Sequence, residues 1–123
     1  MVEYIEAEQA MAVVAKLGFH VRDQGLLLSA LARPSAGMFG EDAYPSIEQK
    51  AAALLSSLSQ NHALFDGNKR LSLLLTFILL ELNGFELMFT DDEAFELVLA
   101  AAQNKRTVDE LAAMIAAGIR LGN

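Results

Sequence analysis

Apolar residues recur at helical spacing along most of the chain, a pattern that predicts α-helices. An amphipathic helix is predicted over 3–17, closed by Gly18 in the left-handed conformation that glycine adopts easily. A shorter helix is predicted over 26–32, because Arg33 precedes Pro34 and the residue before a proline is driven out of the helical region. The N-terminal part is therefore expected to form two helices.

Three more helices are predicted from capping boxes, in which Ser or Thr is followed three positions later by Gln or Glu. The pairs are Ser46 with Gln49, Thr90 with Glu93, and Thr107 with Glu110. The first box opens a helix that continues to about Asn61, and each of the other two opens a helix of about ten to thirteen residues.

The segment 68–82 is apolar on nearly every side, which predicts a central helix that other helices surround. Asn83 and Gly84 form its natural C-terminal stop, and residues 85–89 are predicted to be a short extended segment. The predicted fold class is therefore all-α: one domain over 1–123, a compact bundle of about six helices around a buried central helix, with no sheet.

The loop 35–45 contains two glycines, Pro45, and the aromatic residues Phe39 and Tyr44. Loops of this composition lie at the surface and often carry function. Two interpretations remain open: a mobile flap beside a binding cleft, or a plain connector between helices.

The composition fits one core and limits the function classes. A chain of 123 residues with 54% hydrophobic positions can bury a single core. The sequence has no Cys, which excludes disulfides, thiolate zinc sites and a cysteine nucleophile, and fits a reducing compartment. The net charge is −7 and no basic face is visible, so binding to duplex nucleic acid is not expected.

The longest apolar run, 71–80, is too short to cross a bilayer, which takes roughly 20 residues, so we expect a buried helix and no membrane anchor. The first residues include Glu3, Glu6 and Glu8, unlike the basic and apolar leader of secreted proteins. The expected location is the cytoplasm.

The segment 62–70, His-Ala-Leu-Phe-Asp-Gly-Asn-Lys-Arg, carries the candidate chemistry. A helix that begins near Asn68 presents unpaired N–H groups and the positive end of its dipole to the preceding loop, where an anion is favoured. Gly67 allows close approach of the backbone, and Asn68 can cap the helix or bind a phosphate oxygen. Lys69 and Arg70 oppose the helix dipole unless an anion compensates, so their position indicates a phosphate site.

His62 and Asp66 complete a set of groups suited to phosphoryl or nucleotidyl transfer. A neutral imidazole beside phosphate can act as general base on a hydroxyl nucleophile. The Asp66 carboxylate can hold Mg²⁺, which prefers carboxylate and phosphate oxygens. Each residue also has an ordinary structural explanation: a hydrogen-bonded His at a helix end, an Asp-Gly turn, a solvated Lys-Arg pair. The other histidine, His20, is expected at the surface or the edge of a cleft.

The motif resembles the signature of the Fic/Doc superfamily, His-x-Phe-x-Asp/Glu-Gly/Ala-Asn-Gly/Lys-Arg, and the Lys69 form is similar to the Doc (death-on-curing) branch. The block 21–34, with Arg22, Asp23 and the closing Arg-Pro, also resembles that branch. In this signature Leu64 stands at the usual Phe and is expected to anchor the loop in the core instead, and Leu28 replaces a frequent acidic residue of the upstream block.

The resemblance implies a toxin of a toxin–antitoxin pair, a protein kinase that uses ATP and Mg²⁺ to phosphorylate elongation factor Tu and halt translation. It makes His62 the general base, Asp66 the Mg²⁺ ligand, and Gly67, Asn68, Lys69 and Arg70 the phosphate-binding residues.

Two alternatives remain: a Fic-like enzyme that transfers AMP, and a catalytically silent interaction module. Fic proteins have Gly at the position of Lys69 and a second Arg where Leu73 stands, so both differences favour a kinase. The inhibitory Ser/Thr-x-x-x-Glu-Gly/Asn string of many Fic enzymes does not occur in the sequence. Restraint is therefore expected from a Phd-type antitoxin, whose disordered C-terminal segment folds on the toxin.

Overall fold

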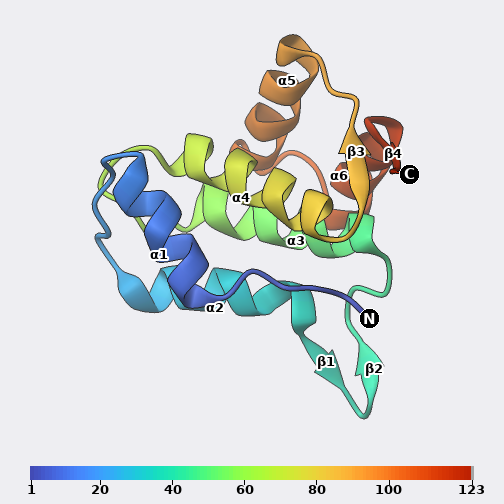
Figure 1. Ribbon diagram of the computed structural model, residues 1–123, viewed down its shortest axis with the longest axis horizontal. Coiled ribbons are helices and arrows are strands. Elements are labelled where there is room, and N and C mark those ends of the chain that lie inside the picture. The colour runs from blue at the N-terminus through green and yellow to red at the C-terminus, as the bar shows by residue number, and fades with distance from the viewer. Residues whose placement is uncertain (123) are drawn as a thin grey trace.

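Helix α3 (Ile47–Gln60) lies at the centre of the computed structural model, which describes residues 1–122 (Figure 1). Helices α2, α4, α5 and α6 all pack against it. The bounds of the other helices are α1 (Ala7–Lys16), α2 (Gln24–Ala32), the 3-10 helix η1 (Arg33–Ser35), α4 (Asn68–Leu82), α5 (Asp91–Ala102) and α6 (Val108–Ala117). The predicted all-α class, a compact bundle with six α-helices in the described chain, is confirmed.

The helix at the centre is α3, whereas the sequence predicted 68–82. In α3, Ala51, Ala52 and Ala53 are fully buried together with its leucines, because small side chains let neighbouring helices approach on several sides. In α4 a single face is buried, built on Leu71, Leu75, Leu79 and Leu80, while the apolar residues between them are half-exposed. The prediction therefore overestimated how much of α4 is buried, because it relied on the apolar composition of the helix alone.

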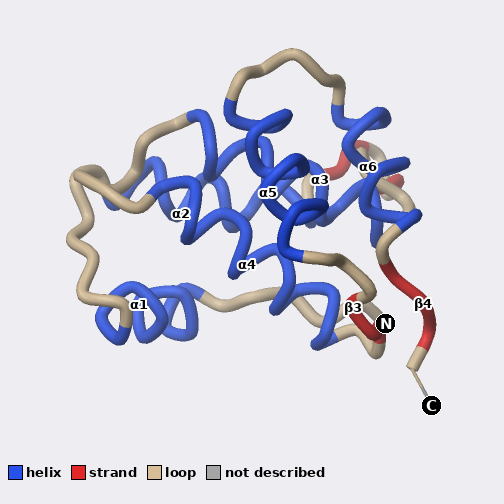
Figure 2. Tube along the Cα trace, turned by 90° about the horizontal axis from the view of Figure 1, so that it is seen from above, coloured by secondary structure: helices blue, strands red, loops and turns tan. Residues whose placement is uncertain are grey.

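Two short antiparallel strand pairs contradict the prediction that the fold has no sheet. Strands β1 (Gly37–Met38) and β2 (Glu41–Asp42) form a hairpin (Figure 1). Strand β3 (Phe85–Leu87) pairs with β4 (Ile119–Leu121) (Figure 2). The extended segment predicted after α4 is thus present, but its partner lies at the far end of the chain. Strands of two or three residues are too short to show an alternating pattern.

Capping residues set the helix starts. The hydroxyls of Ser46, Thr90 and Thr107 each accept a hydrogen bond from the backbone N–H three residues later, as the sequence predicted. Helix α1 starts at Ala7, later than expected, because residues before it are extended and Glu3 exchanges backbone hydrogen bonds with the Asn83 side chain (2.8 and 2.9 Å). No helix within residues 1–122 is long and apolar enough to span a membrane.

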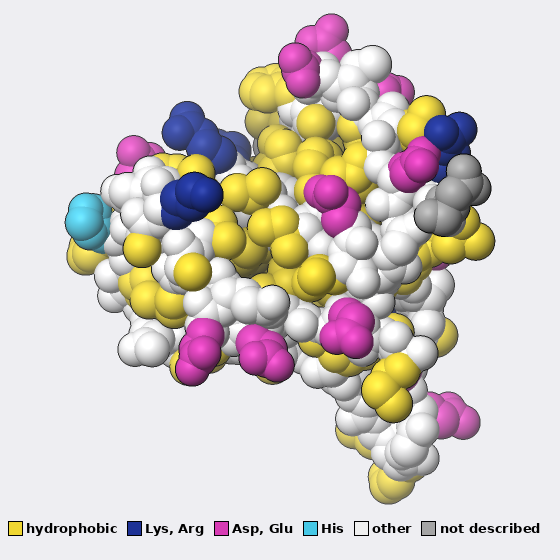
Figure 3. Space-filling view, viewed as in Figure 1, with side chains coloured by type: hydrophobic (Ala, Val, Ile, Leu, Met, Phe, Trp, Pro, Cys, Tyr) yellow, Lys and Arg dark blue, Asp and Glu magenta, His cyan; other side chains and the backbone are white. Residues whose placement is uncertain are grey.

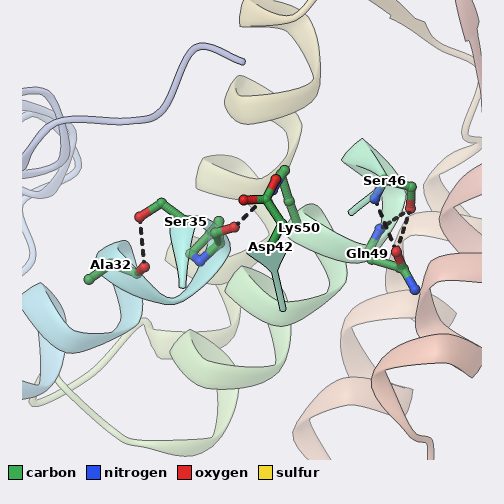
Figure 4. A network of polar contacts seen from close by, with 7 residues as sticks. Ala32, Ser35, Asp42, Ser46, Gln49 and Lys50 are labelled. Atoms are coloured by element: carbon green, nitrogen blue, oxygen red, sulfur yellow. Dashed lines mark hydrogen bonds and ion pairs between the residues drawn. The ribbon is translucent and has the colours of Figure 1, made fainter. Parts of the chain in front are cut away.

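The β1–β2 hairpin is attached to the N-terminal end of α3 by Lys50 (Figure 4). The Lys50 side chain is fully buried, and its ammonium donates to the Asp42 carboxylate at 3.1 Å and to the Pro34 carbonyl at 3.3 Å. Burial disfavours the charged form, but the hydrogen bonds with Asp42 and Tyr4 outweigh it, so the pKa of Lys50 is raised.

The position of this hairpin bears on the interpretation of loop 35–45 as a flap. The cavity that holds the candidate site lies at the C-terminal end of α3, and no residue of 35–45 lines it. The loop is therefore no cover for that cavity. Composition alone could not predict which end of α3 the loop would occupy.

We predict that Asp42→Asn lowers the free energy of unfolding by about 1–3 kcal/mol, because it leaves a buried ammonium without its carboxylate. The raised pKa of Lys50 means that this stabilisation is present at neutral pH and is lost as the pH rises through the folded-state pKa. Urea unfolding at pH 7 measures the change. Glu41→Gln, a neighbouring exposed carboxylate, is the control and should change stability by less than about 0.5 kcal/mol; equal effects would contradict the ion-pair argument.

Candidate active site

A cavity of about 630 Å³ opens where α3 ends, α4 begins and α5 passes by. All six residues predicted from the motif line it: His62, Asp66, Gly67, Asn68, Lys69 and Arg70. Phe95, Val98 and Ala102 of α5 and Leu73 of α4 form an apolar part of the wall. The structure thus brings the candidate base, carboxylate and cations to one space.

The loop that carries the motif pairs with residues 20–23. The N–H groups of Arg22 and Asp23 donate to the Ala63 carbonyl at 2.7 and 3.0 Å, and the Phe65 N–H donates to the His20 carbonyl at 3.1 Å. Val21 and Leu64 form an isolated antiparallel bridge between these hydrogen bonds. His20 contributes to this pairing through its backbone carbonyl. The residue is exposed and does not line the cavity, as expected for a surface position.

Arg22 fixes the turn at which His62 sits. Its Nε donates to the His62 carbonyl at 2.8 Å and its Nη2 to the Asn61 carbonyl at 3.5 Å, so the cation satisfies carbonyls at the end of α3. His62 itself has φ +54°, a left-handed conformation that turns the chain out of the helix. Its imidazole makes no hydrogen bond within the described residues and is exposed at the cavity, where it can accept a proton.

Leu64 and Asn68 hold the loop from inside. Leu64 is 1% exposed, which confirms that it fills the core position expected of the usual Phe. Asn68 accepts from the Leu64 N–H at 2.9 Å and donates to the Leu64 carbonyl at 3.0 Å, so both ends of its amide are occupied. These bonds hold the Asn68 amide against the loop backbone, whereas the sequence had allowed it to cap the helix.

Gly67 is required by a close contact with Phe19. It has φ +89° at the N-cap of α4, and a Cβ added there would lie 2.5 Å from the Phe19 ring. The guanidinium carbon of Arg70 lies 5.8 Å from the centroid of the same ring, a cation–π distance. The Phe19 ring thus packs against the start of α4, next to Gly67 and at cation–π distance from Arg70.

The start of α4 is electropositive and open. No side chain of residues 1–122 caps it, so its first N–H groups face the cavity with the positive end of the helix dipole. Lys69 and Arg70 are exposed beside it, and neither forms an ion pair within the described chain. Figure 3 shows Lys and Arg side chains at this end of the molecule, at the edge of an apolar hollow.

Asp66 is the candidate magnesium ligand. Its Oδ1 accepts from the Gly67 N–H at 2.9 Å, which orients the carboxylate, and the residue is exposed to the cavity. The described residues contain no group of three metal-ligating side chains, so the protein would offer one carboxylate. A single carboxylate combined with phosphate oxygens and water fits Mg²⁺, which dehydrates reluctantly.

Three residues important to this geometry were missed by sequence reasoning. Phe19 and Arg22 were not predicted to touch the motif, and Phe95 of α5, 63% exposed, was not predicted at the cavity. The block 21–34 had been noted for its resemblance, which was a signal for Arg22. Contacts between distant segments carry no periodic pattern, so nothing comparable marked Phe19 or Phe95.

Comparisons with known proteins support the resemblance that the motif indicated. The model of the Fic/DOC family matches residues 2–80, a range that includes the motif and segment 20–23. Toxin Doc of Mycolicibacterium smegmatis (strain ATCC 700084 / mc(2)155) is 42% identical, and the match covers 94% of this chain and 93% of that toxin. The similarity therefore extends over nearly the whole of both chains.

We predict that Gly67→Ala lowers the free energy of unfolding by about 2–4 kcal/mol, because the Cβ adds a clash with Phe19 to the cost of a left-handed conformation. Gly18→Ala is a matched control: its φ is +74° but nothing lies within 4 Å of the added Cβ, so only about 1 kcal/mol is expected. Thermal or urea unfolding measures both. Similar losses in the two variants would show that the Phe19 contact contributes nothing.

Proposed function

This chain belongs to the Fic/DOC family, and on that premise we propose that it is a toxin of a toxin–antitoxin pair that phosphorylates elongation factor Tu. The proposed reaction transfers the γ-phosphate of ATP to a hydroxyl of the target and so inhibits translation. One observation carries the proposal: the uncapped start of α4, with Lys69 and Arg70, shares a cavity with His62 and Asp66.

The phosphates of ATP bind at the start of α4 in this proposal. Backbone N–H groups from Asn68 onward, the Lys69 ammonium and the Arg70 guanidinium supply donors and positive charge to an anion. Phe19 holds Arg70 in place, since the two are at cation–π distance. Positioning and charge stabilisation of this kind account for most of the catalysis in phosphoryl transfer.

His62 is the general base. It accepts the proton of the target hydroxyl as the hydroxyl oxygen bonds to the γ-phosphorus and the bond from that phosphorus to the bridging oxygen breaks, which leaves ADP. Asp66 would hold Mg²⁺, which when bound neutralises charge on the phosphate oxygens. The Arg22 side chain donates to the Asn61 and His62 carbonyls and so keeps the imidazole at the cavity.

Phosphate transfer is favoured over AMP transfer by the side chains on α4. Lys69 occupies the position at which Fic proteins have Gly, and it lines the cavity. Leu73, which replaces the second Arg of those proteins, also lines the cavity and offers no charge to a second phosphate. The site therefore has cations for one end of a triphosphate only.

An antitoxin of the Phd type is the proposed partner. Apolar side chains remain exposed on the side of the molecule where α1, α4 and α5 surround a hollow (Figure 3). Helices α1, α4 and α5 each carry exposed large apolar residues, among them Met11, Leu82 and Phe95. A disordered segment that folds as a helix against this surface would bury them, and Phe95 would place it next to the catalytic cavity.

Intact-mass analysis of elongation factor Tu, incubated with the protein, ATP and Mg²⁺, tests the proposal. We expect a gain of one phosphate, slowed at least about 100-fold by His62→Ala because the general base is lost. His20→Ala, which alters the exposed histidine outside the cavity, is the control and should react at the wild-type rate. A gain of one AMP would identify a Fic-like transferase, and no gain with a folded protein would contradict the proposed target.

A further inference from the structure

A second cavity, of about 650 Å³, lies between α2 and the C-terminal part of α3. It is lined by Ser29, Arg33, Ser56, Ser57, Gln60 and Asn61 together with small apolar residues. None of its lining residues is acidic, although the chain contains 16 Asp and Glu. Arg33 is the one charged residue among them, so the local charge is opposite to that of the whole protein.

The Arg33 guanidinium is fixed in place but lacks a counter-ion. Its Nε donates to the Tyr44 hydroxyl at 3.0 Å, and its Nη1 donates to the Ser57 hydroxyl at 2.8 Å and the Ala53 carbonyl at 3.4 Å. The Tyr44 ring lies 5.5 Å from the guanidinium carbon. Within residues 1–122 its Nη2 has no acceptor and no carboxylate lies at ion-pair distance. A half-buried cation of this kind favours an anion.

Two serine hydroxyls near Arg33 are available as further donors. Ser57 Oγ accepts from Arg33, and Ser56 Oγ accepts from Gln60 Nε2 at 3.0 Å. In the described chain neither hydroxyl proton has an acceptor of its own, so both remain available to a ligand oxygen. The Nη2 group and two hydroxyls on adjacent residues of α3 therefore present donors to the same cavity.

One acceptor at this cavity is also unsatisfied. Asn61 donates through Nδ2 to the Leu26 carbonyl at 2.9 Å, while its Oδ1 is buried and has no hydrogen-bond partner among residues 1–122. Unpaired buried polar atoms are rare in native proteins and call for an explanation. A ligand N–H or O–H group that displaces the cavity edge slightly would satisfy this oxygen.

We propose that the α2–α3 cavity is a second binding site, which takes a small organic anion. Its carboxylate or phosphate oxygens accept from Arg33 Nη2 and from the Ser56 and Ser57 hydroxyls, and a neighbouring donor group of the ligand reaches Asn61. The site does not depend on the proposed kinase function, because its lining shares no residue with the catalytic cavity.

Two-dimensional amide NMR of the full chain, titrated with inorganic phosphate and separately with succinate at constant ionic strength, tests this site. Saturable shifts are expected at the amides of Ser29, Ser56, Ser57 and Asn61. Ser29→Asp places a carboxylate at the exposed rim and should weaken binding by about tenfold or more through charge repulsion. Ala116→Asp adds the same charge at an exposed residue of α6, a helix that contributes no residue to this cavity, and should leave the affinity within about twofold.

Each outcome decides the proposal. Binding of phosphate alone or of succinate alone identifies the preferred oxyanion and supports the site, as long as Ser29→Asp weakens it selectively. Absent shifts at these amides, or equal weakening in both variants, would overturn it. Shifts at Gly67 to Arg70 report phosphate in the catalytic cavity separately, so failure of one site does not imply failure of the other.

Discussion

The pairing between residues 20–23 and the motif loop is the interaction on which the proposed active site depends. Hydrogen bonds from Arg22, Asp23 and Phe65 join two segments that are about forty residues apart, and the Arg22 side chain adds bonds to the carbonyls where α3 ends. These contacts place the start of α4 and His62 in the wall of one cavity. Arg22 and Asp23, which do not line the cavity, therefore help to determine where His62 and the start of α4 lie.

The positive charge at the start of α4 arises because none of the described side chains caps this end of the helix. An N-terminal helix cap is usually Ser, Thr, Asp or Asn, but α4 has Gly67, and the nearest candidate amide, Asn68, is bonded to Leu64 instead. The free N–H groups, Lys69 and Arg70 then concentrate positive potential on a protein whose net charge is −7. The same principle applies between α2 and α3, where Arg33 stands among residues without a carboxylate.

Local patterns predicted local structure well in this chain. Three capping boxes located helix starts, and all six residues predicted from the motif line the cavity of the candidate site. Errors arose where distant segments meet: small residues made α3 the central helix, β3 found its partner at the other end of the chain, and Lys50 fixed the hairpin away from the cavity. Periodicity carries no information about such partners, and the supporting roles of Phe19 and Phe95 were missed for the same reason.

A crystal structure of the protein with Mg²⁺ and a non-hydrolysable ATP analogue would test the central claim most directly. We expect the terminal phosphates to accept hydrogen bonds from backbone N–H groups at the start of α4 and from Lys69 and Arg70, with the metal on Asp66 and with His62 facing the γ-phosphate. Phosphates bound elsewhere, with the start of α4 left empty, would contradict it.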